Sequence, residues 1–222
     1  VDLDREMVVH SHILGVDSVP FASISRFFAY PCYFLNDANA GAYAEGIRSE
    51  SMERFFYISL SNTVGGAIFN DSGLVQGTGF RCGEVGHMTV IPDGEPCYCG
   101  KLGCLDAYCA ASYLSDAASG KLEQFFVRLR QGDEEFGKLW EGYTDYLAIA
   151  INNIHMILDC DIVLGGYVGS YVEEHMQEIW EKVSARSIFT EGRTFVKSCN
   201  YKTGAAALGA ALRVIELFIE EI

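Results

Sequence analysis

The chain has 222 residues, half of them hydrophobic, which is enough for one large domain or two small lobes with a substantial core. Its formal net charge is −14, and because so acidic a surface repels nucleic acid phosphates, any DNA binding requires a separate segment. The longest apolar stretch, residues 146–158, contains asparagine and histidine and is too short to cross a bilayer, and no signal peptide precedes it. Eight cysteines without such a signal indicate a reducing compartment, so we expect a cytoplasmic protein.

The first half of the chain is expected to alternate between short strands and helices. Pro31 ends one predicted helix, an alanine-rich run favours the next, and Asn70-Asp71-Ser72-Gly73 is typical of a hairpin turn. The expected elements are helices at 23–30 and 38–45 and strands at 32–35, 55–60, 65–69, 74–76 and 87–91. Residues 92–103, rich in glycine, proline and cysteine, are expected to form an irregular loop.

The second half is expected to be mostly helical. The expected elements are helices at 105–118, 121–130, 133–158, 170–184 and 205–221, and strands at 161–164 and 194–198, with a tight turn at Gly165-Gly166. In the last helix, an apolar stripe is expected to face the core rather than an interface; its residues are Leu208, Leu212, Ile215 and Ile219. This mixture predicts an α/β protein with helices packed on sheets.

The strongest local signal is a set of four metal-ligand residues at close spacing. They are His87, Cys97, Cys99 and Cys104. Three thiols and an imidazole suit tetrahedral zinc, and with all four positions filled by protein the ion is expected to be structural. Two alternatives are free buried thiols beside an unrelated histidine, and a disulfide. The other five cysteines lack such spacing and are expected to be core or surface residues.

These residues lie within longer motifs that closely resemble the signature of the ROK family, which groups sugar kinases with sugar-responsive transcriptional repressors. The motifs are GEVGHMTV at 83–90 and CYCGKLGCLD at 97–106. NDANA at 36–40 resembles the family's sugar-contacting segment, and IVLGG at 162–166 resembles its glycine turn near the adenosine site. The resemblance runs from about Pro31 to the C-terminus.

The resemblance implies an actin-like, ribonuclease-H-like fold of two lobes around a sugar-binding cleft. It implies that Asp37 is the catalytic base if the protein is a kinase, and that Gly165 and Gly166 lie near a nucleotide. It also implies a set of sugar-binding residues, namely Asn36, Asp37, Glu84 and His87. His87 would serve both zinc and sugar, one through each ring nitrogen. Taken alone, Asp37 also fits a helix N-cap and Glu84 an ordinary surface carboxylate.

The chain departs from the family pattern in two places. Kinases of the family carry Gly-Thr-Gly after the strand that corresponds to 55–60, whereas this chain has Ser61-Asn62-Thr63. Side chains there occupy space that a phosphate needs, which argues against ATP as a cofactor, unless Thr63 supplies a hydroxyl in a tolerated variant. Residues 1–30 also lack the family's Asp-x-Gly-x-Thr turn. We therefore expect residues 1–30 to be a remnant of an incomplete N-terminal lobe and 31–222, with its zinc loop at 87–104, to be the recognisable sugar-binding domain.

Three functions follow as hypotheses. The first is the sugar-sensing and oligomerising domain of a ROK-type transcriptional regulator, which reaches DNA only through a helix-turn-helix segment upstream. The second is an ATP-dependent hexose kinase with Asp37 as general base. The third is an oligomer scaffold with neither activity. The expected partners are a small sugar and further copies of the chain, as a homodimer or homotetramer, with no membrane association.

Overall fold

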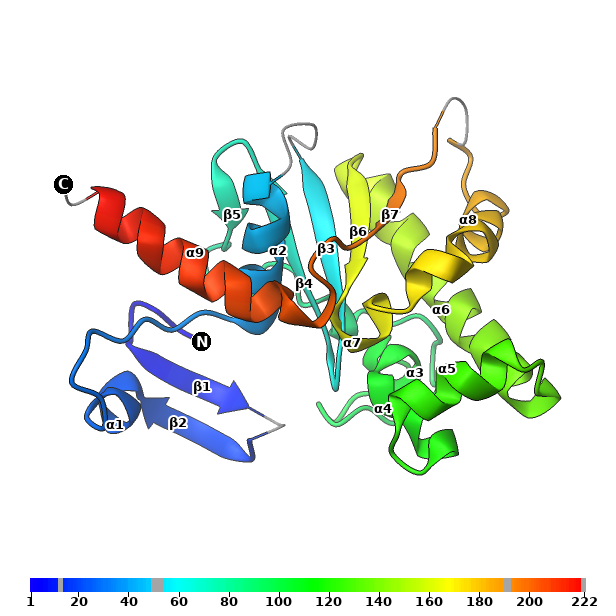
Figure 1. The fold of residues 1–222 in the computed structure, drawn as a ribbon, viewed down its shortest axis with the longest axis horizontal. Helices are drawn as coiled ribbons and strands as arrows, with labels where there is room; N and C mark the ends of the chain where they lie inside the picture. Colours follow the sequence, from blue (N-terminus) through cyan, green and yellow to red (C-terminus); the bar gives the residue numbers. More distant parts are fainter. Residues whose placement is uncertain (12–13, 49–53, 190–192, 221–222) are drawn as a thin grey trace.

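A five-stranded mixed sheet lies at the centre of the molecule (Figure 1). The computed structural model describes residues 1–11, 14–48, 54–189 and 193–220. The strand order is β5-β4-β3-β6-β7; β3 pairs antiparallel with β4 and parallel with β6. The strands are β3 (Phe55–Leu60), β4 (Val64–Asn70), β5 (Gly73–Val75), β6 (Asp161–Gly165) and β7 (Val196–Ser198). This arrangement is the mixed α/β fold expected from the sequence.

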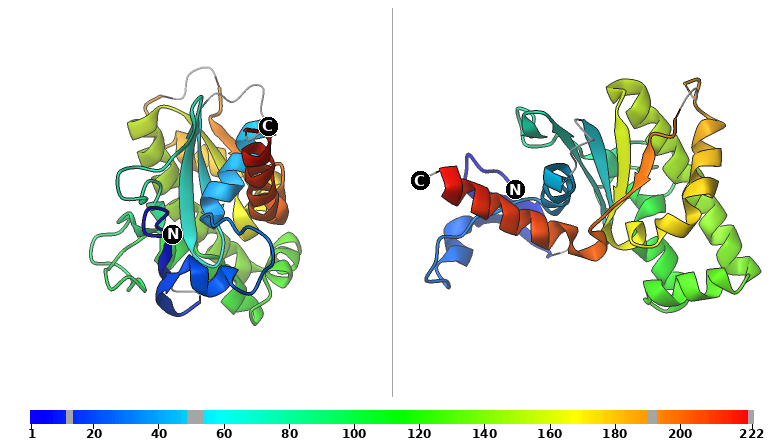
Figure 2. Two further views of the ribbon diagram at one scale, coloured as in Figure 1. Left: turned by 90° about the vertical axis from the view of Figure 1, so that its left-hand side faces the viewer. Right: turned by 45° about the horizontal axis from the view of Figure 1, so that its top comes forward.

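Helices cover both faces of the sheet. Helices α2 and α9 lie against one face and against each other, and α6 and α8 lie on the other face (Figure 2). The helices from residue 37 onward are α2 (Asp37–Arg48), α3 (Asp106–Cys109), α4 (Ala111–Ser115), α5 (Leu122–Arg130), α6 (Glu134–Leu158), α7 (Gly166–Gly169), α8 (Met176–Ser184) and α9 (Ala205–Glu220). In the described part of the chain, no helix combines the length and the apolar character that crossing a membrane requires.

Strand β3 shows why the sheet is buried on both faces. Its side chains alternate between two cores: Phe56 and Ile58 pack into the larger core under α6, and Phe55 and Tyr57 pack into a smaller core under α2. All six residues of the strand are buried. A strand that is covered on both faces consists of a continuous apolar run. Such a run is visible in the sequence, so the first and last residues of the expected strand at 55–60 are both confirmed.

The N-terminal residues form structure that the sequence did not reveal. Strands β1 (Met7–Ser11) and β2 (Val16–Pro20) pair as a separate two-stranded antiparallel sheet, and α1 (Phe21–Ser25) follows directly. The helix expected at 23–30 is therefore wrong in its position, since only its first residues are helical. The strand expected at 32–35 is also wrong: this segment has no strand partner, and Phe34 instead stacks on Phe21 with ring centroids 4.1 Å apart.

Two other expected elements are wrong in detail. The strand at 87–91 is replaced by the 3-10 turn Val85–His87 and a single bridge between Thr89 and Cys104. The helix at 170–184 is divided into the 3-10 turn Val172–His175 and α8. The remaining expected helices and strands are present with shifts at their ends, except that 105–118 is broken in the middle.

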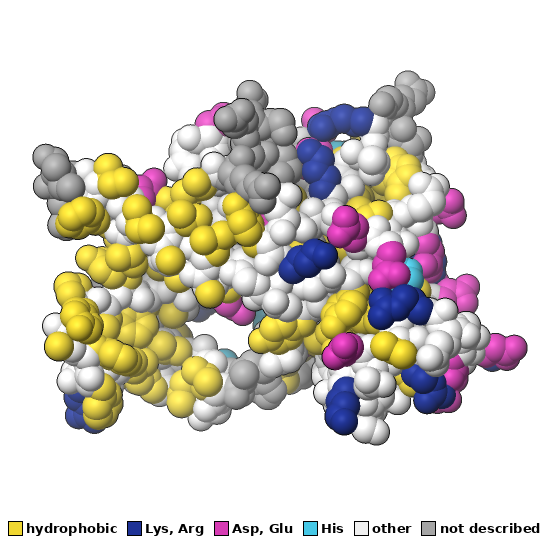
Figure 3. Space-filling model, in the orientation of Figure 1, with side chains coloured by type: hydrophobic (Ala, Val, Ile, Leu, Met, Phe, Trp, Pro, Cys, Tyr) yellow, Lys and Arg dark blue, Asp and Glu magenta, His cyan; other side chains and the backbone are white. Residues whose placement is uncertain are grey.

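Helix α9 does not bury its whole apolar stripe. Leu208 and Leu212 are half-buried against the molecule, but Ile215 and Ile219 are 54% and 65% exposed. The prediction of a core-facing stripe is therefore wrong for its C-terminal half. Hydrophobic side chains gather over α9 and over the N-terminal hairpin, and a hollow separates the two (Figure 3).

Candidate functional site

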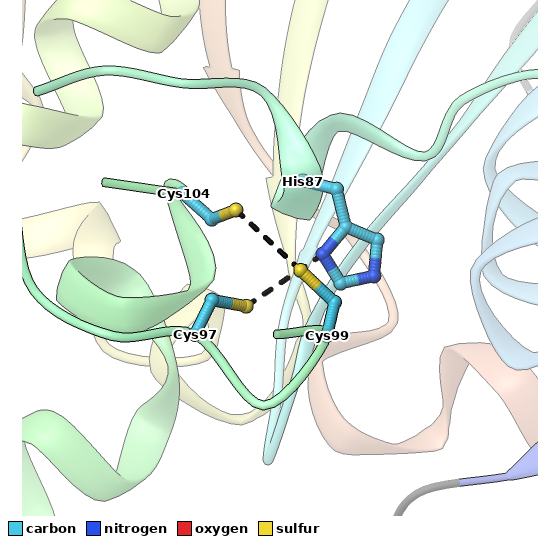
Figure 4. A group of neighbouring side chains, drawn as sticks. All are labelled: His87, Cys97, Cys99 and Cys104. Atoms are coloured by element: carbon cyan, nitrogen blue, oxygen red, sulfur yellow. Dashed lines mark hydrogen bonds between the residues drawn. The ribbon is translucent and has the colours of Figure 1, made fainter. Parts of the chain in front are cut away.

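The four predicted metal ligands converge on one point (Figure 4). One ligand atom from each of them lies within 4.8 Å of the others; the residues are His87, Cys97, Cys99 and Cys104. The Sγ atoms of Cys99 and Cys104 are 3.8 Å apart, as are Cys97 Sγ and His87 Nδ1. A tetrahedron with metal–sulfur bonds of ~2.3 Å has edges of ~3.8 Å, so the donor set fits zinc in both chemistry and spacing.

Backbone hydrogen bonds close the loop that carries the three thiols. Cys97 N–H donates to the carbonyl of Lys101 at 2.8 Å, and Gly103 N–H donates to that of Glu95 at 2.8 Å. Gly103 has φ +72°, and a Cβ atom there would lie 1.6 Å from the carbonyl oxygen of Ile91. Only glycine fits this approach, which brings Cys104 back toward His87.

The protonation of the thiols depends on whether a cation is present. Burial raises the pKa of Cys97, and it raises the pKa of Cys104 to about 12. The backbone N–H of Lys101 lowers the pKa of Cys99 by donating a hydrogen bond to its sulfur. The two buried thiols therefore hold their protons at neutral pH unless a metal ion compensates the charge of the thiolates.

The second nitrogen of His87 has a neighbour that the sequence did not reveal. Its Nε2 atom lies 3.3 Å from the hydroxyl of Tyr98, and the two rings meet edge to face at 5.3 Å between centroids. Tyr98 stands between two of the cysteine ligands, so the same three residues supply two thiols and this hydroxyl. In this arrangement the Nε2 atom, which was expected to contact sugar, faces a side chain of the cysteine loop.

A cavity of about 350 Å³ opens beside the sheet. Its wall is built from the start of the chain, residues 32–36, the glycines of β4, the segment that follows β5, and α9. The charged and amide side chains in the wall are Glu6, Asn36, Asn39, Gln76, Glu84 and Arg213. Amides, carboxylates and a guanidinium beside apolar surface are the groups that bind a polyhydroxylated ligand.

Two of the predicted sugar-binding residues line this cavity, and two lie outside its wall. Asn36 and Glu84 are in the wall. Asp37 directly follows Asn36, and His87 lies three residues after Glu84, but neither of them lines the cavity. Asn36 is the N-cap of α2, since its Oδ1 accepts a hydrogen bond from Asn39 N–H at 3.1 Å. Asp37 is therefore not needed as the cap, and its carboxylate is exposed at the positive end of the helix.

Asp37 lies at the edge of the sheet where β3 and β6 end. These strands run parallel, so their carboxyl ends meet at Ser59 and Gly165, and Ala38 packs against Gly65 at the same end. The turn at 61–63 follows β3, and Gly166 follows β6. Ligands of open α/β sheets bind outside the carboxyl ends of the strands, so this edge is the natural place for a phosphate group.

The two turns at this edge touch each other. A Cβ atom on Gly166 would lie 2.6 Å from Ser61 Oγ and 2.7 Å from Leu60 N, and Ser59 Oγ lies 3.2 Å from Ser61 Oγ. Gly166 has φ +79° and begins α7. The structure thus brings the predicted nucleotide turn against the serine that replaces a family glycine.

A model of the ROK family matches residues 1–216, and so begins at the first residue rather than near Pro31. The N-acetylmannosamine kinase of Escherichia fergusonii is 32% identical over 193 residues, which are 82% of this chain and 64% of that protein. The chain thus spans 64% of the length of that curated relative.

Solved structures agree on the fold. The ROK hexokinase from Thermus thermophilus superposes with a TM-score of 0.79 and 27% identity, over 98% of this chain and 76% of that chain. A ROK family transcriptional regulator, a homolog of the E. coli MLC protein, superposes with a TM-score of 0.75 and 21% identity, over 94% of this chain and 59% of that one. From its sequence motifs, its fold and these matches, the chain belongs to the ROK family.

Proposed function

We propose that the protein is a ROK-type sugar kinase that phosphorylates a hexose or N-acetylated hexosamine, with Asp37 as general base. The observation that carries the proposal is the position of Asp37. Its exposed carboxylate lies at the carboxyl edge of β3 and β6, directly after Asn36, which lines the cavity. A sugar in the cavity and a phosphoryl donor at the strand edge would meet at this carboxylate.

Each group has a distinct chemical task in this proposal. Asn36 and Glu84 hydrogen-bond the sugar hydroxyls and fix the ring in the cavity. Asp37 takes the proton of the attacking sugar hydroxyl. As it does so, the hydroxyl oxygen forms a bond to the γ-phosphorus, and the bond between that phosphorus and the leaving ADP breaks. A zinc ion, when bound, ties His87 to the cysteine loop and so holds the Gly83–Glu84 segment that precedes it.

The comparisons favour a kinase over the regulator that the sequence placed first. The curated relative with 32% identity is a kinase for N-acetylmannosamine, whereas the regulator is 21% identical. N-acetylmannosamine is therefore the first substrate to test, followed by glucose and mannose. This ranking supports the proposal without identifying the sugar.

The second candidate is the sugar-sensing domain of a transcriptional regulator. The observation in its favour is the turn at 61–63, which carries side chains where the family's kinases have two glycines, and whose Ser61 lies close to Gly166. In this case the sugar would shift a population between two arrangements, DNA would be bound by a helix-turn-helix segment upstream, and the domain would form a homodimer or homotetramer.

Turnover and binding measured on the same preparations separate the two candidates. A kinase produces ADP with at least one sugar, and Asp37→Asn lowers kcat by about 10²-fold or more while sugar affinity by calorimetry stays within a few-fold. Asp71→Asn, at an exposed acid in the β4–β5 turn, is the matched control and retains wild-type activity. Sugar binding without ADP production supports the regulator instead. If the protein neither binds a sugar nor produces ADP, both candidates are contradicted, and an oligomer scaffold is favoured.

A further inference from the structure

The metal loop contains one aromatic side chain whose position neither the cavity nor the strand edge explains. Tyr98 lies between Cys97 and Cys99, is 39% exposed, and directs its hydroxyl to Nε2 of His87 at 3.3 Å. The opposite nitrogen of the same imidazole, Nδ1, faces Cys97 Sγ at 3.8 Å. The imidazole thus lies between the thiol cluster on one side and a phenol on the other.

The chemistry of a metal-bound imidazole makes this contact meaningful. If Nδ1 gives its lone pair to a metal ion, Nε2 carries the proton and needs a hydrogen-bond acceptor. A histidine without such an acceptor populates the other tautomer and other ring orientations, and both reduce the affinity for the metal. Tyr98 Oη is placed to accept this hydrogen bond.

A backbone turn and a ring contact position the phenol of Tyr98. Gly100 N–H donates to the carbonyl of Cys97 at 2.9 Å, which closes a tight turn around Tyr98. The edge-to-face contact between the rings of Tyr98 and His87, at 71° between planes, further restricts the imidazole. The same short turn therefore carries two thiols and the hydroxyl, and they face opposite nitrogens of the His87 ring.

We propose that Tyr98 is a positioning residue of the metal loop. Its hydroxyl accepts the Nε2–H hydrogen bond of His87 and thereby holds the imidazole with Nδ1 toward the three thiols. This role is independent of the kinase proposal, because it concerns metal binding and requires neither sugar nor nucleotide.

The test removes the hydroxyl and keeps the ring. Tyr98→Phe retains the edge-to-face contact and loses only the hydrogen bond. Its zinc affinity, measured by competition with a chromophoric chelator, is therefore expected to fall 10- to 100-fold. Tyr167→Phe, at a tyrosine that is 45% exposed on α7, is the matched control and leaves the affinity unchanged. A wild-type affinity for Tyr98→Phe overturns the proposal.

A second measurement reports the protonation of His87 directly, first in the wild-type protein and then in the variant. In the wild-type zinc form, long-range proton–nitrogen NMR is expected to show His87 protonated at Nε2, with slow exchange of that proton with solvent. In Tyr98→Phe the same proton exchanges faster, which a purely structural role of the ring does not produce. A wild-type His87 that is protonated at Nδ1, or whose Nε2 proton exchanges freely, also overturns the proposal.

Discussion

Glu45 shows how a single buried carboxylate can join two helices. It lies on α2, is fully buried, and accepts hydrogen bonds from Asn200 N–H at 2.8 Å, Asn200 Nδ2 at 2.7 Å and Tyr201 N–H at 3.0 Å. These donors belong to the turn that precedes α9. A glutamate in an alanine-rich helix usually faces solvent, so the sequence gives no sign of this role.

Replacing Glu45 should therefore destabilise the protein by more than an ordinary surface change. Glu45→Ala leaves three donors without their acceptor and is expected to lower the free energy of unfolding by about 3 kcal/mol or more. Glu45→Gln keeps one carbonyl oxygen and is expected to cost less than half as much. Urea unfolding curves measure both, and equal losses for the two variants would show that volume rather than hydrogen bonding determines the effect.

The candidate site was readable from sequence only where chemistry dictates the residue type. Three cysteines and a histidine at short spacing predict the metal cluster, and the structure brings them together. The hydroxyl beside His87 was not predictable, because a tyrosine between two cysteines carries no chemical signature. The same holds for Arg213 in the cavity wall, which comes from a helix more than a hundred residues away in the chain.

At the scale of elements, prediction succeeded where the pattern is local and failed where a distant group intervenes. The helix expected at 105–118 breaks at Ala110 because Ala111 N–H donates to the carbonyl of Ser61 at 2.7 Å rather than continuing the helix. No periodicity within 105–118 can reveal that acceptor. Likewise, 32–35 has the composition of a strand, but no strand of the described chain pairs with it.

Two glycines in helices should respond to alanine in opposite ways. Gly166→Ala places a Cβ atom against Ser61 and Leu60 at positive φ, and is expected to destabilise the protein by about 1–3 kcal/mol. Gly137→Ala, inside α6 with no atom within 4 Å of the new Cβ, is expected to stabilise it by about 0.5–1 kcal/mol. Thermal melting of both variants provides the comparison, and a neutral Gly166→Ala would contradict the close contact between the two turns.

For the whole molecule, metal binding at the His87–Cys104 cluster would connect stability to the metal and to pH. The loop that carries the cysteines lies between the sheet and helices α3 and α4, and Cys104 and Leu105 are both buried. An ion that binds only the folded chain stabilises it in proportion to its affinity. A zinc ion held by the four residues would therefore stabilise this half of the molecule.

The rise in melting temperature that zinc produces should become smaller as pH falls. The pKa of Cys104 is raised to about 12 and that of Cys97 is also raised, so zinc must displace their protons, and the displacement is harder in acid. We expect the difference in melting temperature between zinc-loaded and chelator-treated protein to be larger at pH 8 than at pH 6. Cys99→Ser should largely abolish this difference at both pH values, and a difference independent of pH would contradict ligation by thiolates.

The pairing of β3 with β6 has a consequence for how the chain is made. Phe55 pairs with Asp161, so the centre of the sheet joins segments separated by on the order of a hundred residues, and closing so long a loop slows folding. At a synthesis rate of roughly 5–20 residues per second, β3 leaves the ribosome several seconds before its parallel neighbour exists. During that interval the hairpin with β4 protects one edge of β3 and leaves the other open. The nascent chain is therefore most exposed to aggregation, and to capture by chaperones, before residue 165 has emerged.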